Sequence, residues 1–360
     1  TGKGRIWKVE SSSHAQNRSD ANQEAMKIRS YAALHPAKLG NLLGHRNRKV
    51  RYRAQFELAN RDKAGIEVFK DQLLQSTDPI ARIHALWGLG QLAEKLDPRT
   101  SITPSVIIAL KANHPEVRAQ AAKIVGNLSL PAKKTQALLY LLEDESPRVI
   151  YQAIMSATKL KLASATPATL KILQTDWAYD PAIRHAGVSY LSALLKPSTL
   201  SDFSHHPDKR LREAAVLALR RLESPLIEPF LKDAEPEIVF ETIRAIHDLP
   251  IPELQERLAS FAQEQTLHGK PLPFPITHRI LNANFRLGST RHAKRISEIA
   301  ANHSLSFEIR LEALESLRQW NHPSAFDRVT WNLRPHTETR ERNIGPWVRK
   351  DLLATFSEFL

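Results

Sequence analysis

The segment HPEVRAQA, residues 114–121, returns in variant form along most of the chain. In it a turn residue and Pro come first, followed by a β-branched residue, then Arg118, two spacers and the small residue Ala121. His or Asp ahead of Pro suits a helix N-cap and first helical position, where Pro loses no hydrogen bond. Apolar residues then recur at intervals of three and four, as on one face of a helix. The segment therefore predicts the start of an amphipathic helix.

The same order of residue types occurs nine times. Besides 114–121, the copies are RKVRYRA (48–54), DPIARIHA (78–85), SPRVIYQA (146–153), DPAIRHAG (180–187), HPDKRLREAA (206–215), EPEIVFET (235–242), PITHRILN (275–282) and FEIRLEA (307–313). From position 51 to position 310 the mean spacing is (310 − 51)/8, about 32 residues, which is room for two helices and a turn. This period predicts an all-α fold, an α/α superhelix with about nine helical-hairpin repeats over residues 36–333. Since no single unit can bury its apolar face alone, stability has to come from neighbouring units.

An arginine recurs at one position of the repeat and resembles the ladder arginine of HEAT-repeat solenoids. The candidate ladder residues are Arg51, Arg82, Arg118, Arg184, Arg212, Arg279 and Arg310. We interpret them as structural, packing between repeats and binding turn carboxylates such as Asp78 or Asp180. A row of arginines that reads a ligand is the alternative. Ile150 and Val239 stand at two ladder positions, which a ligand-reading row would tolerate less easily.

The chain is basic, and its charge is unevenly spread. The net charge is +13; residues 1–53 hold 12 Lys and Arg against 3 Asp and Glu, and the remaining residues hold 39 against 35. The run HRNRKVRYR (45–53) supplies a candidate patch for an acidic partner, formed by Arg46, Arg48, Lys49, Arg51 and Arg53. A solvated basic helix is the simpler interpretation; an acidic protein, an adjacent domain and a polyanionic glycan are candidate partners. The near-neutral remainder disfavours a long groove for nucleic acid.

Chemistry-bearing motifs are scarce. With no Cys there are no disulfides, thiolate metal sites or C-x-x-C-H haem attachment, and none of the 15 His is followed by Glu, as the HEAT-type iron hydroxylases require. His205-His206 precedes Pro207, which favours capping or solvent exposure over metal binding. No phosphate-binding loop or zinc-protease motif occurs, and no stretch has the roughly 18 apolar residues of a membrane span. The sequence predicts no catalytic, cofactor-binding or metal-binding residue.

The sharpest alternative is a basic, HEAT-like nucleic-acid-binding protein of the alkylpurine DNA glycosylase type. It rests on the net charge and on DWAYD (176–180), where aromatic residues adjoin carboxylates. We favour the simpler interpretation, in which Trp177 and Tyr179 end one helix and Asp180-Pro181 begins the next. A third hypothesis is a stand-alone scaffold for an acidic protein.

Four segments resemble one particular architecture. They are ARIHALWGLGQL (81–92), FLKDAEPEIVFETIRAIHDLPIPE (230–253), ITHRILNANFRLG (276–288) and IRLEALESLRQWNHPSAFDRVTWNLRP (309–335). They are similar to the HEAT array of large, haem-binding, membrane-bound-dehydrogenase-like proteins of planctomycetes and verrucomicrobia. In that family a β-propeller precedes the array and a cytochrome c follows it. The opening GRIWKVE (4–10) is similar to the closing strand of such a propeller.

The resemblance implies a division of the chain and a setting for it. Residues 1–10 would be a strand-like remnant of the propeller, 11–35 a linker, 36–333 the solenoid, and 334–360 an exit segment with a C-terminal amphipathic helix. The chain would be a non-enzymatic scaffold within a larger periplasmic or secreted electron-transfer protein. Haem c, with PQQ as a further candidate, would belong to the flanking propeller and cytochrome domains, which would be its partners. No catalytic position of the family has a counterpart here.

Overall fold

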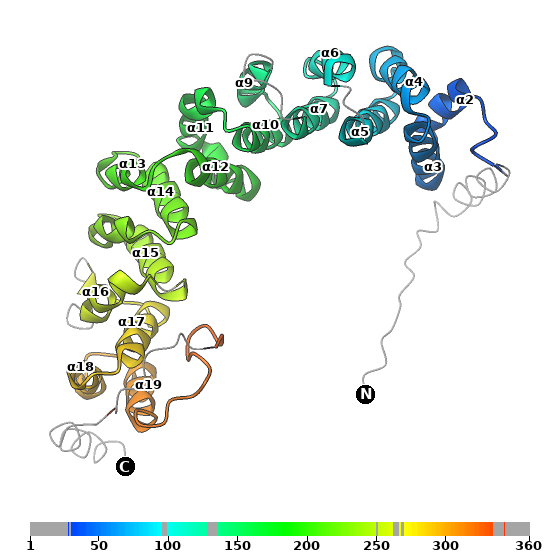
Figure 1. The fold of residues 1–360 in the computed structure, drawn as a ribbon. Helices are drawn as coiled ribbons and strands as arrows, with labels where there is room; N and C mark the ends of the chain where they lie inside the picture. Colours follow the sequence, from blue (N-terminus) through cyan, green and yellow to red (C-terminus); the bar gives the residue numbers. More distant parts are fainter. Residues whose placement is uncertain are drawn as a thin grey trace, which may run out of the picture. The chain divides into compact units, whose positions relative to one another are not determined.

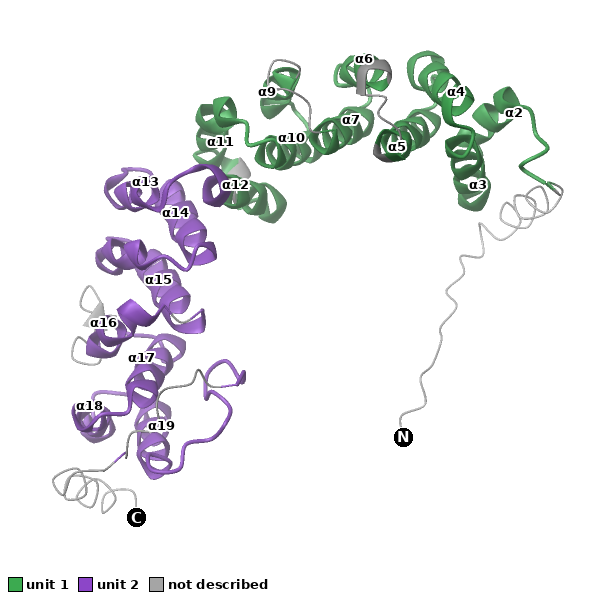
Figure 2. Ribbon diagram, in the orientation of Figure 1, with its two compact units in different colours: residues 1–190 green, residues 191–360 purple. Residues whose placement is uncertain are grey.

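A computed structural model describes residues 28, 30–95, 99–128, 135–249, 251–261, 266–267, 270–333 and 342. The predicted strand at 4–10, the linker up to residue 27 and the exit segment with its helix, apart from residue 342, lie outside the described residues. The chain divides into two compact units, residues 1–190 and 191–360 (Figure 2).

The described part of unit 1 consists of helices and their turns (Figure 1). Its elements are α2 (Pro36–Asn41), η2 (Leu42–Gly44), α3 (Arg48–Ala59), α4 (Asp62–Gln75), α5 (Pro79–Lys95), α6 (Arg99–Ala109), α7 (Pro115–Asn127), α9 (Ala137–Tyr140), η3 (Leu141–Glu143), α10 (Pro147–Lys159), η4 (Ala163–Ala165), α11 (Thr166–Leu173), η5 (Asp176–Tyr179) and α12 (Pro181–Leu194), which ends just past the boundary.

Unit 2 continues the helical pattern and adds a small hairpin. Its elements are α13 (Pro197–Asp202), η6 (Phe203–His205), α14 (Lys209–Arg221), η7 (Pro225–Lys232), α15 (Pro236–Asp248), η8 (Pro252–Leu254), α16 (Gln255–Ser260), β1 (Thr266–Leu267), β2 (Lys270–Pro271), α17 (Phe274–Leu287), α18 (Thr290–Ala301) and α19 (Phe307–Arg318). The strands β1 and β2 pair antiparallel, with Thr266 opposite Pro271 and Leu267 opposite Lys270.

One helix of each repeat carries the ladder position, and we call these the ladder helices. Within the described residues they are α3, α5, α7, α10, α12, α14, α15, α17 and α19. From α3 to α10 and from α14 to α19, successive ladder helices contact one another, as α3 contacts α5 and α14 contacts α15. In unit 1 they form one layer, and α4, α6, α9 and α11 form the other (Figure 1). The predicted all-α solenoid is thereby confirmed.

Local sequence explains where the ladder helices begin. The side chains of Asn47, His114 and Asp208 each accept the backbone N–H two residues on, so they cap α3, α7 and α14. Pro147 and Pro236 begin α10 and α15, where the missing N–H costs no bond.

Small residues let neighbouring ladder helices approach closely. Ala85, Ala121, Ala153 and Ala215 each lie three residues after a ladder position and are fully buried. At Gly126 of α7 an added Cβ would lie 2.9 Å from the backbone of Ser156 in α10, so even alanine would force the helices apart.

Candidate functional site

The ladder arginine of α7 is bound on both sides. Nε and Nη2 of Arg118 donate to the two carboxylate oxygens of Asp144 at 2.7 and 2.8 Å. Its Nη1 donates to the carbonyls of Ala112 and Asn113, six and five residues earlier, at 2.8 and 2.9 Å. Burial raises the pKa of Asp144, but the hydrogen bonds from Arg118 and the Ser146 N–H outweigh burial and lower it. The guanidinium therefore ties the turn before its own helix to the next repeat.

Arg212 of α14 repeats this geometry. It binds Asp233 at 2.8 and 3.1 Å, and its Nη1 reaches the carbonyls of His206 and Pro207, again six and five residues earlier. The Asp233 side chain is 1% exposed and that of Arg212 is 11% exposed. Such a buried, bidentate pair is fully engaged within the array and offers little to a ligand.

The other ladder positions use different acceptors. The Nε groups donate as follows: Arg51 to His84 (3.0 Å), Arg82 to the Leu73 carbonyl (2.9 Å), Arg279 to Asp248 (2.9 Å) and Arg310 to the Ala300 carbonyl (3.0 Å). Arg184 occupies the equivalent place in α12, while Ile150 and Val239 are buried in the core. Each described bond of these arginines thus runs to another part of the array.

The carboxylates that bind Arg118 and Arg212 differ from those the sequence indicated. Asp144 and Asp233 end the companion 3-10 helices η3 and η7 and accept the N–H two residues on. Asp78 and Asp180 instead cap α5 and α12, accepting the N–H groups of Ile80 and Ala182. Helix capping and binding of a ladder arginine both use an aspartate in a turn. The sequence alone therefore does not show which aspartate has which role.

The basic run folds into a patch around the start of α3. Arg46, Arg48, Lys49 and Arg53 are exposed, and α3 has no acidic residue in its first turn. Arg51 differs, since its Nη1 donates to the carbonyls of His45 and Arg46 and its Nε to His84. The candidate patch therefore divides into four exposed cations and one structural arginine.

A line of aromatic rings adjoins the exposed cations and continues from α3 to α5. The Arg48 guanidinium lies 5.7 Å from the Tyr52 ring centroid, and Tyr52 stacks on Phe56 with centroids 6.3 Å apart. Tyr52 also meets His84 edge-on at 5.4 Å, and His84 meets Trp87 at 5.0 Å. The sequence shows Tyr52 within the basic run. It does not show that the rings form a line, because they come from two different repeats.

His84 is the buried centre of this line. It is 3% exposed, its Nε2 accepts from Arg51, and its Nδ1 lies 2.7 Å from Gln55 Oε1. This arrangement requires the neutral imidazole with its proton on Nδ1. Burial, and then the charge of Arg51, lower the pKa of His84 to about 4.

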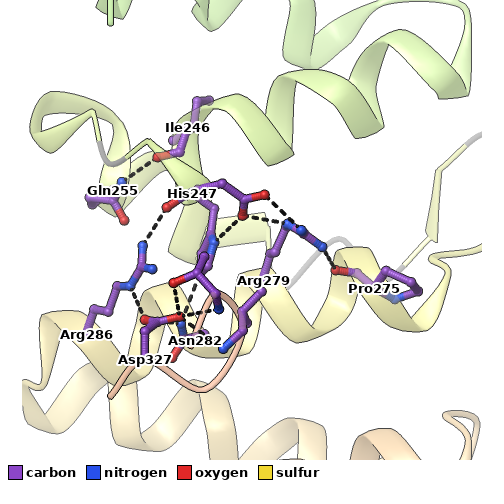
Figure 3. A network of polar contacts seen from close by, with 11 residues as sticks. Ile246, His247, Gln255, Pro275, Arg279, Asn282, Arg286 and Asp327 are labelled. Carbon is purple, nitrogen blue, oxygen red and sulfur yellow. Dashed lines mark hydrogen bonds and ion pairs between the residues drawn. The ribbon is translucent and has the colours of Figure 1, made fainter. Parts of the chain in front are cut away.

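A second polar cluster lies in unit 2, where α15, α17 and a loop after α19 meet (Figure 3). Arg286 donates to Asp327 at 2.8 Å and to the His247 carbonyl at 2.7 Å. Asn282 donates to the same carboxylate at 2.7 Å and lies 3.0 Å from His247 Nε2. Asp248 binds His247 and Arg279. His247 has no exposed surface, so it has no access to a substrate.

This cluster fixes the loop 321–333. Burial raises the pKa of Asp327, but hydrogen bonds from Arg286 and the Thr330 N–H outweigh burial and hold it well below the usual range. Arg328 binds Glu312 of α19 at 2.6 and 2.9 Å. Although burial raises the pKa of Glu312, the hydrogen bonds from His278 and Arg328 keep it at about 2.

The anchored loop displays apolar side chains. Phe326 and Leu333 form an isolated antiparallel bridge, and they are 55% and 75% exposed. Trp331 is 78% exposed and has a left-handed backbone with φ of 59°. Left-handed backbone is strained for a residue with a Cβ, and such strain persists only where surrounding contacts enforce it. No signal in the sequence singled out these side chains.

The other motifs considered above, His205-His206 and residues 176–180, are not assembled into a binding site within the described residues. His206 accepts the Asp208 N–H, and its neighbour His205 lines a cavity of about 410 Å³ with Lys232 and Glu228 among others. That lining mixes both signs of charge. Asp176 to Tyr179 form η5. Among the described residues no group of three or more His, Asp or Glu side chains is placed to hold a metal, and no helix is long and apolar enough to span a membrane.

Comparison with known proteins gives one family match and several structural neighbours. The family model for HEAT repeats matches residues 102–192. Among solved structures, the CpcE–CpcF complex of phycocyanin lyase from Nostoc is 22% identical over 74% of this chain and 90% of that chain, with a TM-score of 0.33. An engineered protein is 16% identical over 80% and 89%, with a TM-score of 0.34. YibA of Escherichia coli is 17% identical over 87% and 100%, with a TM-score of 0.30. No curated protein matches the chain in sequence.

Proposed function

We propose that the chain is a non-catalytic HEAT-repeat scaffold that holds protein partners. The main support for this proposal is that the charged side chains of the ladder bind each other. Buried ladder arginines and their carboxylates bind each other between repeats, as Arg118 binds Asp144 and Arg212 binds Asp233. Pairs of this kind tie neighbouring repeats together, so these ladder side chains are not available as the acid or base that general acid–base catalysis would need.

We further propose that the scaffold is one part of a larger protein. The resemblance of residues 230–253, 276–288 and 309–335 supports a place within a larger periplasmic or secreted dehydrogenase-like protein that contains cytochrome c. There the array would separate a propeller from a haem domain, and haem would belong to the neighbour. The solenoid fold supports the scaffold role. The resemblance of these three segments alone supports the dehydrogenase-like setting.

Two measurements test these proposals separately. Purified chain should show no haem absorbance and no quinone-dependent sugar oxidation, and either signal would refute the scaffold. For the setting, we expect the reading frame to encode a propeller before Thr1 and a C-x-x-C-H motif after Leu360. A frame with neither would refute the dehydrogenase-like setting and leave the scaffold standing.

A further inference from the structure

The exposed cations of α3 and the rings beside them form what we call the α3 surface: Arg46, Arg48, Lys49, Arg53, Tyr52 and Phe56. We propose that this surface binds an acidic peptide segment that carries an aromatic residue among its carboxylates. The inference rests on the proposed function only in taking the array as a protein-binding module.

The charges of the α3 surface are poorly explained by stability. Arg48 and Lys49 occupy the first turn of α3, where the helix dipole disfavours cations. Residues 30–60 hold six Lys and Arg against one Glu, and that Glu57 is bound by Arg61. Within the described part of the chain, no carboxylate pairs with Arg48, Lys49 or Arg53.

The geometry fits a short acidic segment. On α3, Arg48, Tyr52 and Phe56 are spaced by four residues and share one stripe, and Lys49 and Arg53 follow the adjacent stripe. Carboxylates can therefore meet cations on both stripes while a ring packs on Phe56. The Phe56 side chain is 53% exposed, which leaves apolar area available for burial.

A nucleic acid fits less well. Single-strand binding needs cations that follow the backbone over several nucleotides. Beyond α3, the aromatic line leads to Trp87, which donates to Gln120, and Gln120 in turn donates to Glu116. Glu116 also binds Arg148 at 3.2 Å, so the charges at that point balance each other and the basic region is short. Peptide binding is favoured for this reason.

The test measures fluorescence anisotropy with the full chain. The probe is a fluorescein-labelled short peptide of Glu and Asp with one central Trp. Arg48→Glu with Lys49→Glu should weaken binding at least roughly tenfold, since it reverses two contacts. Phe56→Ala should weaken binding about threefold or more and remove the preference over a Trp-to-Ser peptide. Lys111→Glu, an exposed charge at the end of α6, is the matched control and should leave binding unchanged.

Circular dichroism and urea unfolding must first show that each variant folds; all four substituted side chains are exposed. Equal or tighter binding of a single-stranded oligonucleotide or a heparin fragment of matched charge would overturn the proposal. Absence of peptide binding, or equal weakening by Lys111→Glu, would also overturn it. None of these results bears on the haem and reading-frame tests, so the two proposals can fail independently.

Discussion

At the scale of single residues, this chain uses two kinds of charge pair in the same repeat. Arg212 and Asp233 are 11% and 1% exposed, whereas Lys209 and Glu235 are 60% and 37% exposed at 3.5 Å. Removing one member of a buried pair strands the other, while an exposed pair is screened by water and salt. The ladder contacts should therefore dominate the electrostatic part of stability.

We expect Asp233→Ala to lower the free energy of unfolding by about 2–4 kcal/mol, because Arg212 and the Glu235 N–H lose their acceptor. Lys209→Ala should cost under about 0.5 kcal/mol. Urea denaturation of both variants measures the difference. Equal losses would show that the ladder contributes no more than a surface ion pair.

His84 should make stability depend on pH. Its pKa in the folded chain, about 4, lies below the usual 6.5, so the unfolded chain binds more protons between these values. Its contribution is complete above pH 6.5 and is lost as pH falls toward 4, by up to about 1.4 kcal/mol per pH unit. His84→Gln keeps a donor and an acceptor but cannot titrate, so it should flatten urea midpoints measured from pH 7 to pH 5. If the urea midpoint of His84→Gln changes with pH as much as that of the original chain, the pH dependence of stability arises elsewhere. Buried His247 and His292, whose pKa values are also lowered, are examples.

At the scale of elements, the loop 321–333 shows how distant parts of the chain fix an irregular segment. Asp327 meets Arg286, which is 41 residues away, and its own carboxylate also accepts the N–H groups of Val329 and Thr330. These contacts hold the backbone of Trp331 in its left-handed conformation. The loop is thus ordered by buried polar contacts rather than by an apolar core.

Trp331→Gly should raise the free energy of unfolding by roughly 0.5–1 kcal/mol, since Gly adopts positive φ without strain. The Trp side chain is 78% exposed, so little buried area is lost. Trp331→Ala keeps the Cβ and is the control, with no expected gain. If Ala stabilises as much as Gly, backbone strain is not the cause.

At the scale of the whole molecule, the ladder contacts given above for the described residues join neighbouring repeats, as in a quasi-one-dimensional stack. Asp233→Ala should therefore speed hydrogen exchange in α14, η7 and α15 while leaving α3 and α5 unchanged. Exchange measured by mass spectrometry on peptides from both units provides the check. A uniform increase along the chain would mean that the molecule unfolds as one cooperative body.

The sequence by itself determined the helical class, the period and the starts of the ladder helices, because Pro, capping side chains and apolar spacing act within a few residues. It also indicated the positions of Arg118 and Arg212, whose guanidinium groups bind Asp144 and Asp233. Only the tertiary structure decided which carboxylates bind the arginines, that Arg279 reaches back to Asp248, and that His84 stands between Arg51 and Gln55. The aromatic line and the Asp327 cluster likewise join residues from different repeats. Such contacts depend on how repeats stack, and one sequence read locally does not specify which of several similar turn residues will meet.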